Sequence, residues 1–526
     1  MAPTFNLIDE KWIPCVPTGG GTVTEVGIAE ALMNASEYQE IYDNSPLVTV
    51  SIHRLLLAIL HRACGPTNLR ESRKLVRNGL PVDEIRTYLY KWYDRFDLFS
   101  KDYPFYQTAG LKIPNPSALS RLANEVNFGG IFDHSADDGT PAYLSAEAAR
   151  LVVAAQSFAL GFGKSASATI GSEKIEPPYS ADAILLRGLT IWLTGSSLLD
   201  TLLINLCPDD PREDDLPAWE LDAPHKLRDK QVNGKRMSIS ARGIIDRYTW
   251  QSRLMRILPT QEESKVFVKE VFFTQGREAD KSPHDPMKAY TRSEKEGFVP
   301  ISLSMFKASW RDAHSILSTN KNEILRPAAF NFVAELLYEG ILESDATYTV
   351  NAVGLATAPN KAGKFILWRH DRFTTPAVLL KNQDLVERLG ELLGDSERVG
   401  SRLWEVTREL CKAYLSMGER KTDADAVTNL SSEIDPRRDY WSKMEGHFHT
   451  LLRELPKDKD AAGKQWNEAI VREARVAFNK SASQLGQSGR AIRARAKVMA
   501  TFDLNRTKSD KERSTKSEEA SNDRDE

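Results

Sequence analysis

Apolar side chains recur with helical spacing through the last third of the chain. Four stripes place apolar residues three or four positions apart: Leu385, Leu389, Leu392 and Leu393; Leu403, Thr407, Leu410, Tyr414 and Met417; Trp441, Met444, Phe448, Leu451, Leu452 and Leu455; and Trp466, Ala469, Ile470, Ala474, Ala477 and Phe478. Residues at this spacing share one helix face, so each stripe predicts an amphipathic helix. Four such helices in sequence predict a C-terminal four-helix bundle over residues 376–502.

The first 375 residues mix strand-like and helix-like patterns. Segments 265–273 and 347–350 favour strands, whereas segments 53–63 and 146–160 favour helices. This mixture predicts an α+β fold in which a large, irregular N-terminal body of mixed α/β structure precedes the bundle. Residues 503–526 are nearly all charged or small and polar, which predicts a disordered tail.

The first strand signal lies in residues 5–14. Apolar and polar residues alternate there until Pro14, which predicts an opening β-strand that buries Leu7 or Ile8 together with Trp12.

The composition of the chain limits the classes of function that it can have. The 526 residues carry a formal charge of −3, so nucleic-acid binding would need local basic patches. Four widely separated cysteines offer no zinc-ligand spacing and suit a reducing cytoplasm. The start has no signal-peptide pattern, and Arg187 and Asp200 interrupt the most apolar run, 184–206, which predicts a buried helix. We therefore expect a cytoplasmic protein with no membrane partner.

Seven short motifs in order along the chain resemble the large-subunit (CasA) family of type I-E CRISPR Cascade complexes. They lie at residues 5–14, 92–107, 132–134, 161–165, 248–253, 308–310 and 369–371, and the resemblance covers about residues 3–500. It implies a subunit without catalytic residues, metal or cofactor. The partners it implies are the other Cascade proteins, crRNA, double-stranded target DNA with its short PAM, the displaced strand, and a helicase-nuclease effector.

The glycine segment is the first candidate DNA contact. Gly161 and Gly163 permit close approach of the backbone to a groove or phosphate, and Lys164 adds a phosphate contact. A nucleotide-binding P-loop is excluded because Phe158 stands where that motif requires glycine. A helix C-cap at Gly161 without any ligand is the alternative.

The second candidate is the loop with Phe132, Asp133 and His134. A phenylalanine at a loop tip can wedge at a base step, and histidine can hydrogen-bond a base or phosphate. An ordinary surface loop is the alternative. The resemblance makes this the family's recognition loop, with His134 where the family has asparagine.

The third candidate is the strand over residues 265–273. The resemblance implies a minor-groove lysine at the position of Val271, so we expect Lys269, two residues earlier on the same strand face, to replace it, with Lys265 in reserve. A solvent-facing lysine without a ligand is the alternative.

A fourth candidate is a hairpin tip formed by Asn360, Lys361, Ala362, Gly363 and Lys364. The resemblance implies a wedge that separates the first base pair, with Ala362 where the family has glutamine. The two lysines would offset part of the cost of unstacking by contacting phosphates. A plain exposed hairpin is the alternative.

The last candidate is a basic stretch over residues 471–498. It contains a single acidic residue, Glu473, and seven basic residues: Arg472, Arg475, Lys480, Arg490, Arg493, Arg495 and Lys497. This excess predicts a path for displaced single-stranded DNA or for the complex's nucleic-acid backbone. A solvated helix face is the alternative.

Two other classes of function compete with this interpretation. A metal-dependent HD-type nuclease or phosphohydrolase is suggested by the pairs His284-Asp285 and His370-Asp371 and by His447 with His449. Residues two apart on a helix point to different faces, which argues against a shared site for the last pair. A scaffold subunit without DNA contacts is the other alternative.

Overall fold

The computed structural model describes residues 3–123, 141–161, 167–175, 179–210, 212–227, 231–232, 235–236, 238–263, 265–280, 285–357, 365–416 and 422–499. The chain forms two compact units. The first comprises residues up to Ser309 together with Ile316–Lys381, and the second comprises Trp310–Ser315 together with the chain from Asn382 onwards.

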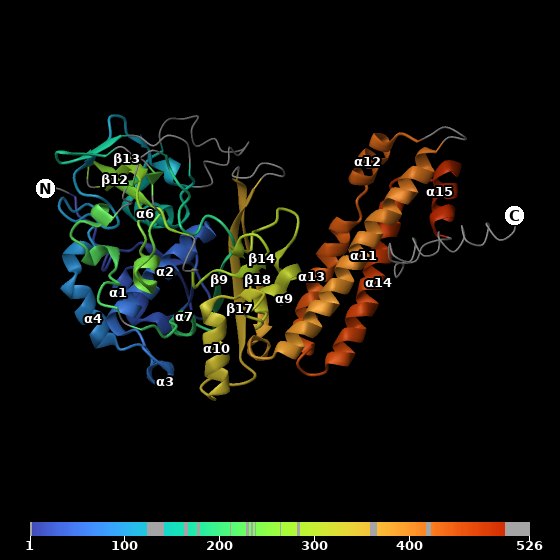
Figure 1. The fold of residues 1–526 in the computed structure, drawn as a ribbon, viewed down its shortest axis with the longest axis horizontal. Helices are drawn as coiled ribbons and strands as arrows, with labels where there is room; N and C mark the ends of the chain where they lie inside the picture. Colours follow the sequence, from blue (N-terminus) through green and yellow to red (C-terminus); the bar gives the residue numbers. More distant parts are fainter. Residues whose placement is uncertain are drawn as a thin grey trace. The chain divides into compact units, whose positions relative to one another are not determined.

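The first unit is mixed α/β, as predicted, and its strands form several small sheets (Figure 1). Its α-helices are α1 (Ile28–Met33), α2 (Pro46–Cys64), α3 (Leu69–Asn78), α4 (Val82–Lys91), α6 (Ser145–Phe158), α7 (Leu198–Asn205), α8 (Ile244–Tyr248) and α10 (Ala328–Tyr338). The sheets follow the orders β2-β1-β3, β10-β11, β12-β13-β5 with β6 also on β13, β15-β14-β16, β18-β17-β9 and β4-β7-β8.

The strands of this unit are short except for two hairpins. Their bounds are β1 (Ile13–Pro17), β2 (Thr24–Val26), β3 (Tyr38–Ile41), β4 (Leu111–Lys112), β5 (Ser117–Ala118), β6 (Tyr143–Leu144), β7 (Ala168–Ile170), β8 (Glu173–Ile175), β9 (Thr190–Thr194), β10 (Gln231–Val232), β11 (Lys235–Arg236), β12 (Arg253–Glu262), β13 (Lys265–Gln275), β14 (Tyr290–Ser293), β15 (Gly297–Pro300), β16 (Ile324–Leu325), β17 (Thr347–Thr357) and β18 (Phe365–Pro376).

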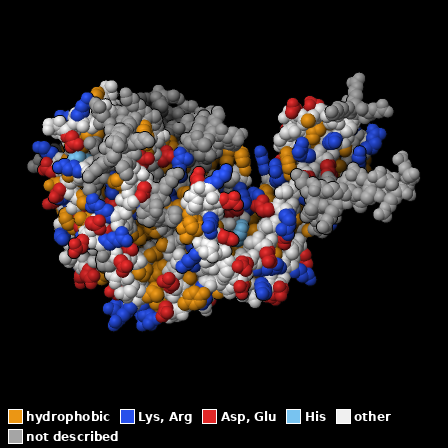
Figure 2. Space-filling model, in the orientation of Figure 1, with side chains coloured by type: hydrophobic (Ala, Val, Ile, Leu, Met, Phe, Trp, Pro, Cys, Tyr) orange, Lys and Arg blue, Asp and Glu red, His pale blue; other side chains and the backbone are white. Residues whose placement is uncertain are grey.

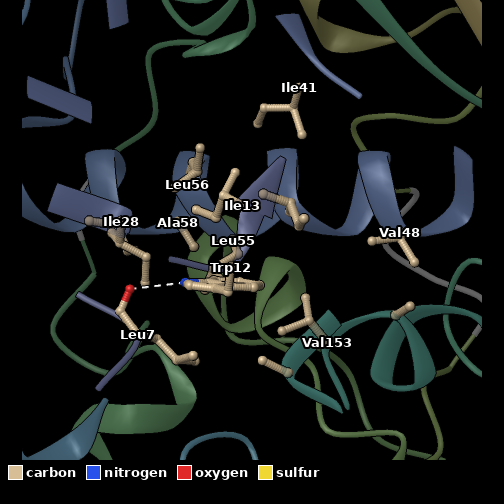
Figure 3. Close-up of a cluster of buried hydrophobic side chains, with 14 of the residues drawn as sticks. Leu7, Trp12, Ile13, Ile28, Ile41, Val48, Leu55, Leu56, Ala58 and Val153 are labelled. Carbon is tan, nitrogen blue, oxygen red and sulfur yellow. Dashed lines mark hydrogen bonds between the residues drawn. The ribbon is translucent and has the colours of Figure 1, made fainter. Parts of the chain in front are cut away.

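The opening segment forms part of the main core. Trp12 is fully buried, donates its indole N–H to the Leu7 carbonyl at 2.9 Å, and packs against β1, α2 and α6 (Figure 3). The predicted burial is correct, but the predicted strand is wrong. The chain turns after Asn6, because the Asn6 side-chain oxygen accepts from the Ile8 N–H and its carbonyl accepts from the Asp9 and Glu10 N–H groups. The strand begins only at Ile13.

Two long apolar segments of this unit are both buried. The run over 184–206 is not one helix as expected: it contains strand β9 and helix α7, and most of its apolar side chains are buried. Among the described residues one helix, α2, passes the length and hydropathy test for a membrane span, and 78% of its most apolar window is buried inside the protein. Such burial is typical of a core helix.

The second unit is helical, as predicted, but its helices differ from the predicted four. They are α11 (Gln383–Leu415), α12 (Ala424–Glu433), α13 (Arg437–Glu454), α14 (Lys459–Ser483) and α15 (Gly489–Met499), with α11, α13 and α14 side by side in Figure 1. The first apolar stripe and the second stripe up to Tyr414 belong to one helix, α11, whereas Met417 lies outside the described residues. Two shorter helices, α12 and α15, were not predicted, and residues 503–526 lie outside the described part.

A short segment from the middle of the chain completes the helical unit. The Trp310 ring lies 5.0 Å from Phe448, and Arg311 stacks 3.6 Å above the Trp441 ring. Arg311 also donates two hydrogen bonds to the Glu397 carboxylate, at 2.7 and 2.6 Å. Helix α9 (Ala313–Leu317) begins in this segment. The helical unit is therefore tied to the body by three chain connections, at 309/310, 315/316 and 381/382.

Two histidines of α2, the buried His53 and the partly buried His61, predict an acid-sensitive fold. Burial lowers the pKa of both His53 and His61 to about 4, from an ordinary value of 6.5. The unfolded chain therefore binds more protons than the folded one between pH 6.5 and pH 4, so stability falls as the pH drops through that window. We expect urea unfolding at pH 5 to give a free energy lower by about 2 kcal/mol per histidine than at pH 7.

The variant His53→Phe/His61→Phe isolates this contribution. It removes both titrating groups, so it should lose less stability than wild type between pH 7 and pH 5. An unchanged pH dependence in the variant would show that other groups govern acid unfolding.

Candidate nucleic-acid interface

The β12–β13 hairpin carries the two strand lysines that the sequence singled out. Its antiparallel register shifts by one residue, with Leu258 opposite Glu270 but Pro259 opposite Val268, so Lys269 has no partner in β12. An extra residue of this kind is a β-bulge, which redirects side chains, and proline tolerates such sites because it has no N–H to pair.

The bulge changes which faces the strand residues occupy. Val271 is fully buried, whereas the Lys269 side chain is 42% exposed and its ammonium lies 3.1 Å from Glu262. The expectation that Lys269 and Val271 share a face is therefore wrong, because the bulged residue breaks the alternation. Lys265 is exposed next to the turn of the hairpin, where it pairs with Glu262 of β12. Lys269 is thus presented to solvent from a rigid strand.

Both ends of the predicted recognition loop are attached beside Lys269. Strand β5 pairs with Glu270 and Val271, and β6 pairs with Phe267 and Val268, so the two short strands flank Lys269 on one edge of β13. The chain between them contains residues 124–140. Phe132, Asp133 and His134 lie outside the described residues, but the attachment points of their loop lie within a few residues of Lys269.

Arg253 anchors the chain directly before the glycine segment. This buried side chain, at the start of β12, donates to the carbonyls of Leu160 at 2.8 Å and Ala159 at 3.2 Å, directly before Gly161. It also donates to the Ala181 carbonyl at 2.7 Å, in the chain that follows β8. One guanidinium therefore joins the end of α6 to the segment after β8.

Gly161 is required by close packing. A β-carbon there would lie 2.7 Å from Asp182 Oδ1 and 2.8 Å from the Ser180 carbonyl oxygen, closer than real side chains permit. The Gly161 N–H donates to Asp182 Oδ1 at 3.0 Å, and Asp182 Oδ2 accepts from Arg187 at 2.6 Å. The glycine thus has a structural role at the base of the loop, whereas Gly163 and Lys164 lie outside the described residues.

The return of the glycine segment is also packed on the hairpin. Strand β7 pairs with β4, and their side chains form a small core with Leu254 of β12 and Phe272 of β13. Lys269 lies six residues from Gln275, which pairs with Arg253. The points where the two loops join the β12–β13 hairpin are therefore about 20 Å apart along it.

The second hairpin was predicted from the strand patterns around residues 347–350 and 365–368. Strands β17 and β18 pair over eleven positions, from Thr347 opposite Pro376 to Thr357 opposite Phe365, which confirms the two arms. Gly354 of β17 packs against Leu189 and Leu303, and Val353 belongs to the core shared with β12 and β13. Asn360, Lys361, Ala362, Gly363 and Lys364 lie outside the described residues.

Most cations of the basic stretch have structural partners. Arg490 donates to the Tyr414 carbonyl, and Arg495 donates to the carbonyls of Ala482 and Gly486 at the end of α14. Arg472 pairs with Glu473 at 2.9 Å, and Lys480 pairs with Asp439 at 2.6 Å.

Three of the seven cations remain without a described ion pair. Arg475, Arg493 and Lys497 are exposed and make no ion pair with any residue that the structure describes. Arg475 and Arg472 line an open groove of about 910 Å³ with Arg388 and Lys464. The sequence count overestimated the free positive charge because it omitted backbone carbonyls and acids from other helices.

The histidine-aspartate pairs have structural partners instead of a metal geometry. Burial and the nearby Arg372 lower the pKa of His370 to about 4, and its ring stacks on Trp192 and bonds Asn351 at 3.0 Å. Asp371 accepts from Arg369 and from the Ser309 N–H. No group of three potential metal ligands occurs among the described residues.

Asp285 has an arginine partner in the core. Arg54 donates to its two oxygens at 2.9 and 3.0 Å, and both side chains are buried. Burial raises the pKa of Asp285, but Arg54 with Arg247 and Lys288 more than offsets this and leaves the pKa below its ordinary value. Its partner in the sequence pair, His284, lies outside the described residues.

Comparisons with known proteins agree on one family. The family model for CRISPR-associated protein Cse1 matches residues 6–477. CRISPR-associated protein CasA/Cse1 of Thermus thermophilus is 33% identical over 510 residues, covering 95% of this chain and 96% of that protein.

Solved structures share the fold. A crystal structure of CasA from Thermus thermophilus has a TM-score of 0.78 at 31% identity and covers 95% of this chain and 98% of its own. A chain of a CRISPR RNA-guided surveillance complex has a TM-score of 0.72 at 19% identity, covering 95% and 99%, which shows the common fold alone.

Proposed function

Because the chain belongs to the CRISPR-associated Cse1 (CasA) family, we propose that it is the non-enzymatic DNA-sensing subunit of a cytoplasmic crRNA-guided Cascade complex. In this role it inspects duplex DNA for the PAM through the minor groove, helps to open the duplex, and recruits the helicase-nuclease. The fold shared with a chain of an RNA-guided surveillance complex supports assembly with other Cascade subunits and crRNA.

One observation supports the proposal above the others: strand β13 presents Lys269 between the two attachment points of the 124–140 loop. The strands that flank the loop and the lysine are thereby brought to one sheet edge, although more than 120 residues separate them in sequence. Presentation from a paired strand fixes the backbone of Lys269, which limits the entropy lost when it contacts DNA.

In the proposed mechanism, recognition of the PAM and opening of the duplex use different parts of the chain. The minor groove distinguishes mainly A·T from G·C pairs, so a lysine and a loop inserted there would accept several related PAMs. The glycine segment, about 20 Å along the hairpin, would contact the backbone of the same duplex. The tip of β17–β18 would then wedge at the first base pair. Because R-loop formation is nearly balanced in energy, a modest contribution at that pair can decide initiation.

The test uses the assembled complex and duplexes labelled with 2-aminopurine at the first base pair. We expect tight binding and a fluorescence rise only with an intact PAM. The variant Lys361→Ala/Lys364→Ala should keep PAM selectivity but open the pair more slowly. If mutation of the PAM changed neither binding nor fluorescence, the chain would act as a scaffold without DNA contacts. If the isolated chain cleaved DNA in a metal-dependent reaction, it would be a nuclease.

A further inference from the structure

A second basic surface lies on helix α3, far in sequence from the proposed DNA contacts. Its ten residues hold four bases, Arg70, Arg73, Lys74 and Arg77, against one acid, Glu71. Figure 2 shows these Lys and Arg side chains gathered where Figure 1 places α3. This local excess contrasts with the net negative charge of the whole chain.

Three of the four bases form an outward stripe. Arg70, Lys74 and Arg77 are exposed and follow the i, i+4, i+7 spacing of one helix face, which spans about 10 Å. Arg70 and Arg77 form no ion pair or hydrogen bond with any residue in the described part of the chain. Their charge is therefore available to an outside partner.

The fourth base joins the stripe to an exposed aromatic ring. Arg73 donates to the Glu339 carbonyl at 3.2 Å and lies 3.7 Å from its carboxylate, which ties α3 to the end of α10. Tyr338, the last residue of α10, is 70% exposed. Its hydroxyl donates to the Lys381 carbonyl at 2.9 Å, so the ring is held in place, and the Lys381 ammonium lies 5.4 Å from the ring centroid.

A cationic stripe beside a fixed, exposed ring suits a polyanion with unpaired bases. Cations bind successive phosphates, and a ring that is already ordered stacks on a base with little further loss of entropy. An acidic protein surface would use the cations but would leave the ring without a matching group.

We propose that Arg70, Lys74, Arg77 and Tyr338, here called the α3–α10 patch, bind a single strand of nucleic acid. The three cations contact phosphates, and Tyr338 stacks on an unpaired base. This surface goes beyond the proposed PAM reading and uses none of its residues, so its failure would leave that function standing.

The test measures binding of a fluorescein-labelled 20-nucleotide single strand to the full chain between 50 and 200 mM KCl. Each phosphate contact on a single strand contributes about 0.7 to the salt slope, so Arg70→Ala/Lys74→Ala/Arg77→Ala should flatten the slope by about 2. It should also weaken binding at 50 mM KCl about tenfold or more. The control Lys443→Ala/Arg453→Ala/Lys457→Ala removes equal charge from the helical unit and should leave the slope unchanged.

The ring is tested separately. Tyr338→Ala should weaken single-strand binding about fivefold or more without changing the salt slope, whereas Tyr338→Phe, which keeps the ring, should bind nearly as wild type.

Three results would overturn the proposal. One is an unchanged slope in the α3 triple variant, and another is an equal loss in the control. The third is a loss confined to duplex DNA, or to co-purification with other Cascade proteins, which would assign the surface to a duplex or to a protein partner.

Discussion

Replacing Arg253 by methionine should destabilise the protein by about 3–5 kcal/mol and abolish PAM-dependent binding. The guanidinium supplies donors to the carbonyls of Leu160 and Ala181, and methionine supplies none, whereas the Ala159 carbonyl keeps the Ala183 N–H as a donor. Each buried acceptor left without a donor costs about 1–3 kcal/mol. The chain directly before the glycine segment would lose its anchor to β12 and to the segment after β8.

The matched control is Arg256→Met on the same strand. Arg256 is only partly buried, so its replacement should cost about 1 kcal/mol or less. Urea unfolding measures the stability of both variants, and amide exchange at residues 159–161 reports the loosening of the loop base. Equal stability of the two variants would show that Arg253 does not position this loop.

Replacing Asp285 by leucine should destabilise the fold by about 3–5 kcal/mol, because it leaves the Arg54 charge buried without its carboxylate. The single variant Arg54→Met should cost a similar amount for the reciprocal reason. The double variant should recover part of the loss, since neither charge of the pair then remains in the core, while the buried Arg247 and Lys288 still lose the Asp285 carboxylate.

This cycle also separates a structural aspartate from a metal ligand. Urea unfolding of wild type and the three variants, with and without added Mn²⁺, should show no stabilisation by the metal. A metal-dependent gain in wild type that disappears in Asp285→Leu would contradict the ion-pair role and favour the HD-type alternative.

The apolar pattern predicted which faces of the C-terminal helices are buried, but it did not predict where one helix ends. Two stripes became one helix because Gly400, between them, does not break it. A β-carbon at Gly400 would lie 2.7 Å from the Trp441 ring, so this glycine allows α13 to pack closely on α11. A local sequence signal cannot distinguish a glycine used for packing from one used as a stop.

Candidate residues were predictable where chemistry was local and unpredictable where it depended on distant partners. Lys269 was singled out through the family resemblance, but its exposure follows from a bulge. Pro259 in the opposite strand was the available signal, since proline within a strand run indicates a bulge or an edge. Arg253 lay in a recognised motif, yet its role depends on carbonyls more than 70 residues away, which no spacing rule reveals.

The most direct test of the account is a PAM-library binding screen of the assembled complex with wild type, Lys269→Ala and Glu262→Gln. Lys269→Ala removes the cation between the loop attachments, so it should flatten the PAM preference and reduce the salt slope by about 1. Glu262→Gln releases Lys269 from its 3.1 Å ion pair and should strengthen binding at low salt. A PAM profile and salt slope identical to wild type in both variants would contradict reading of the PAM from β13.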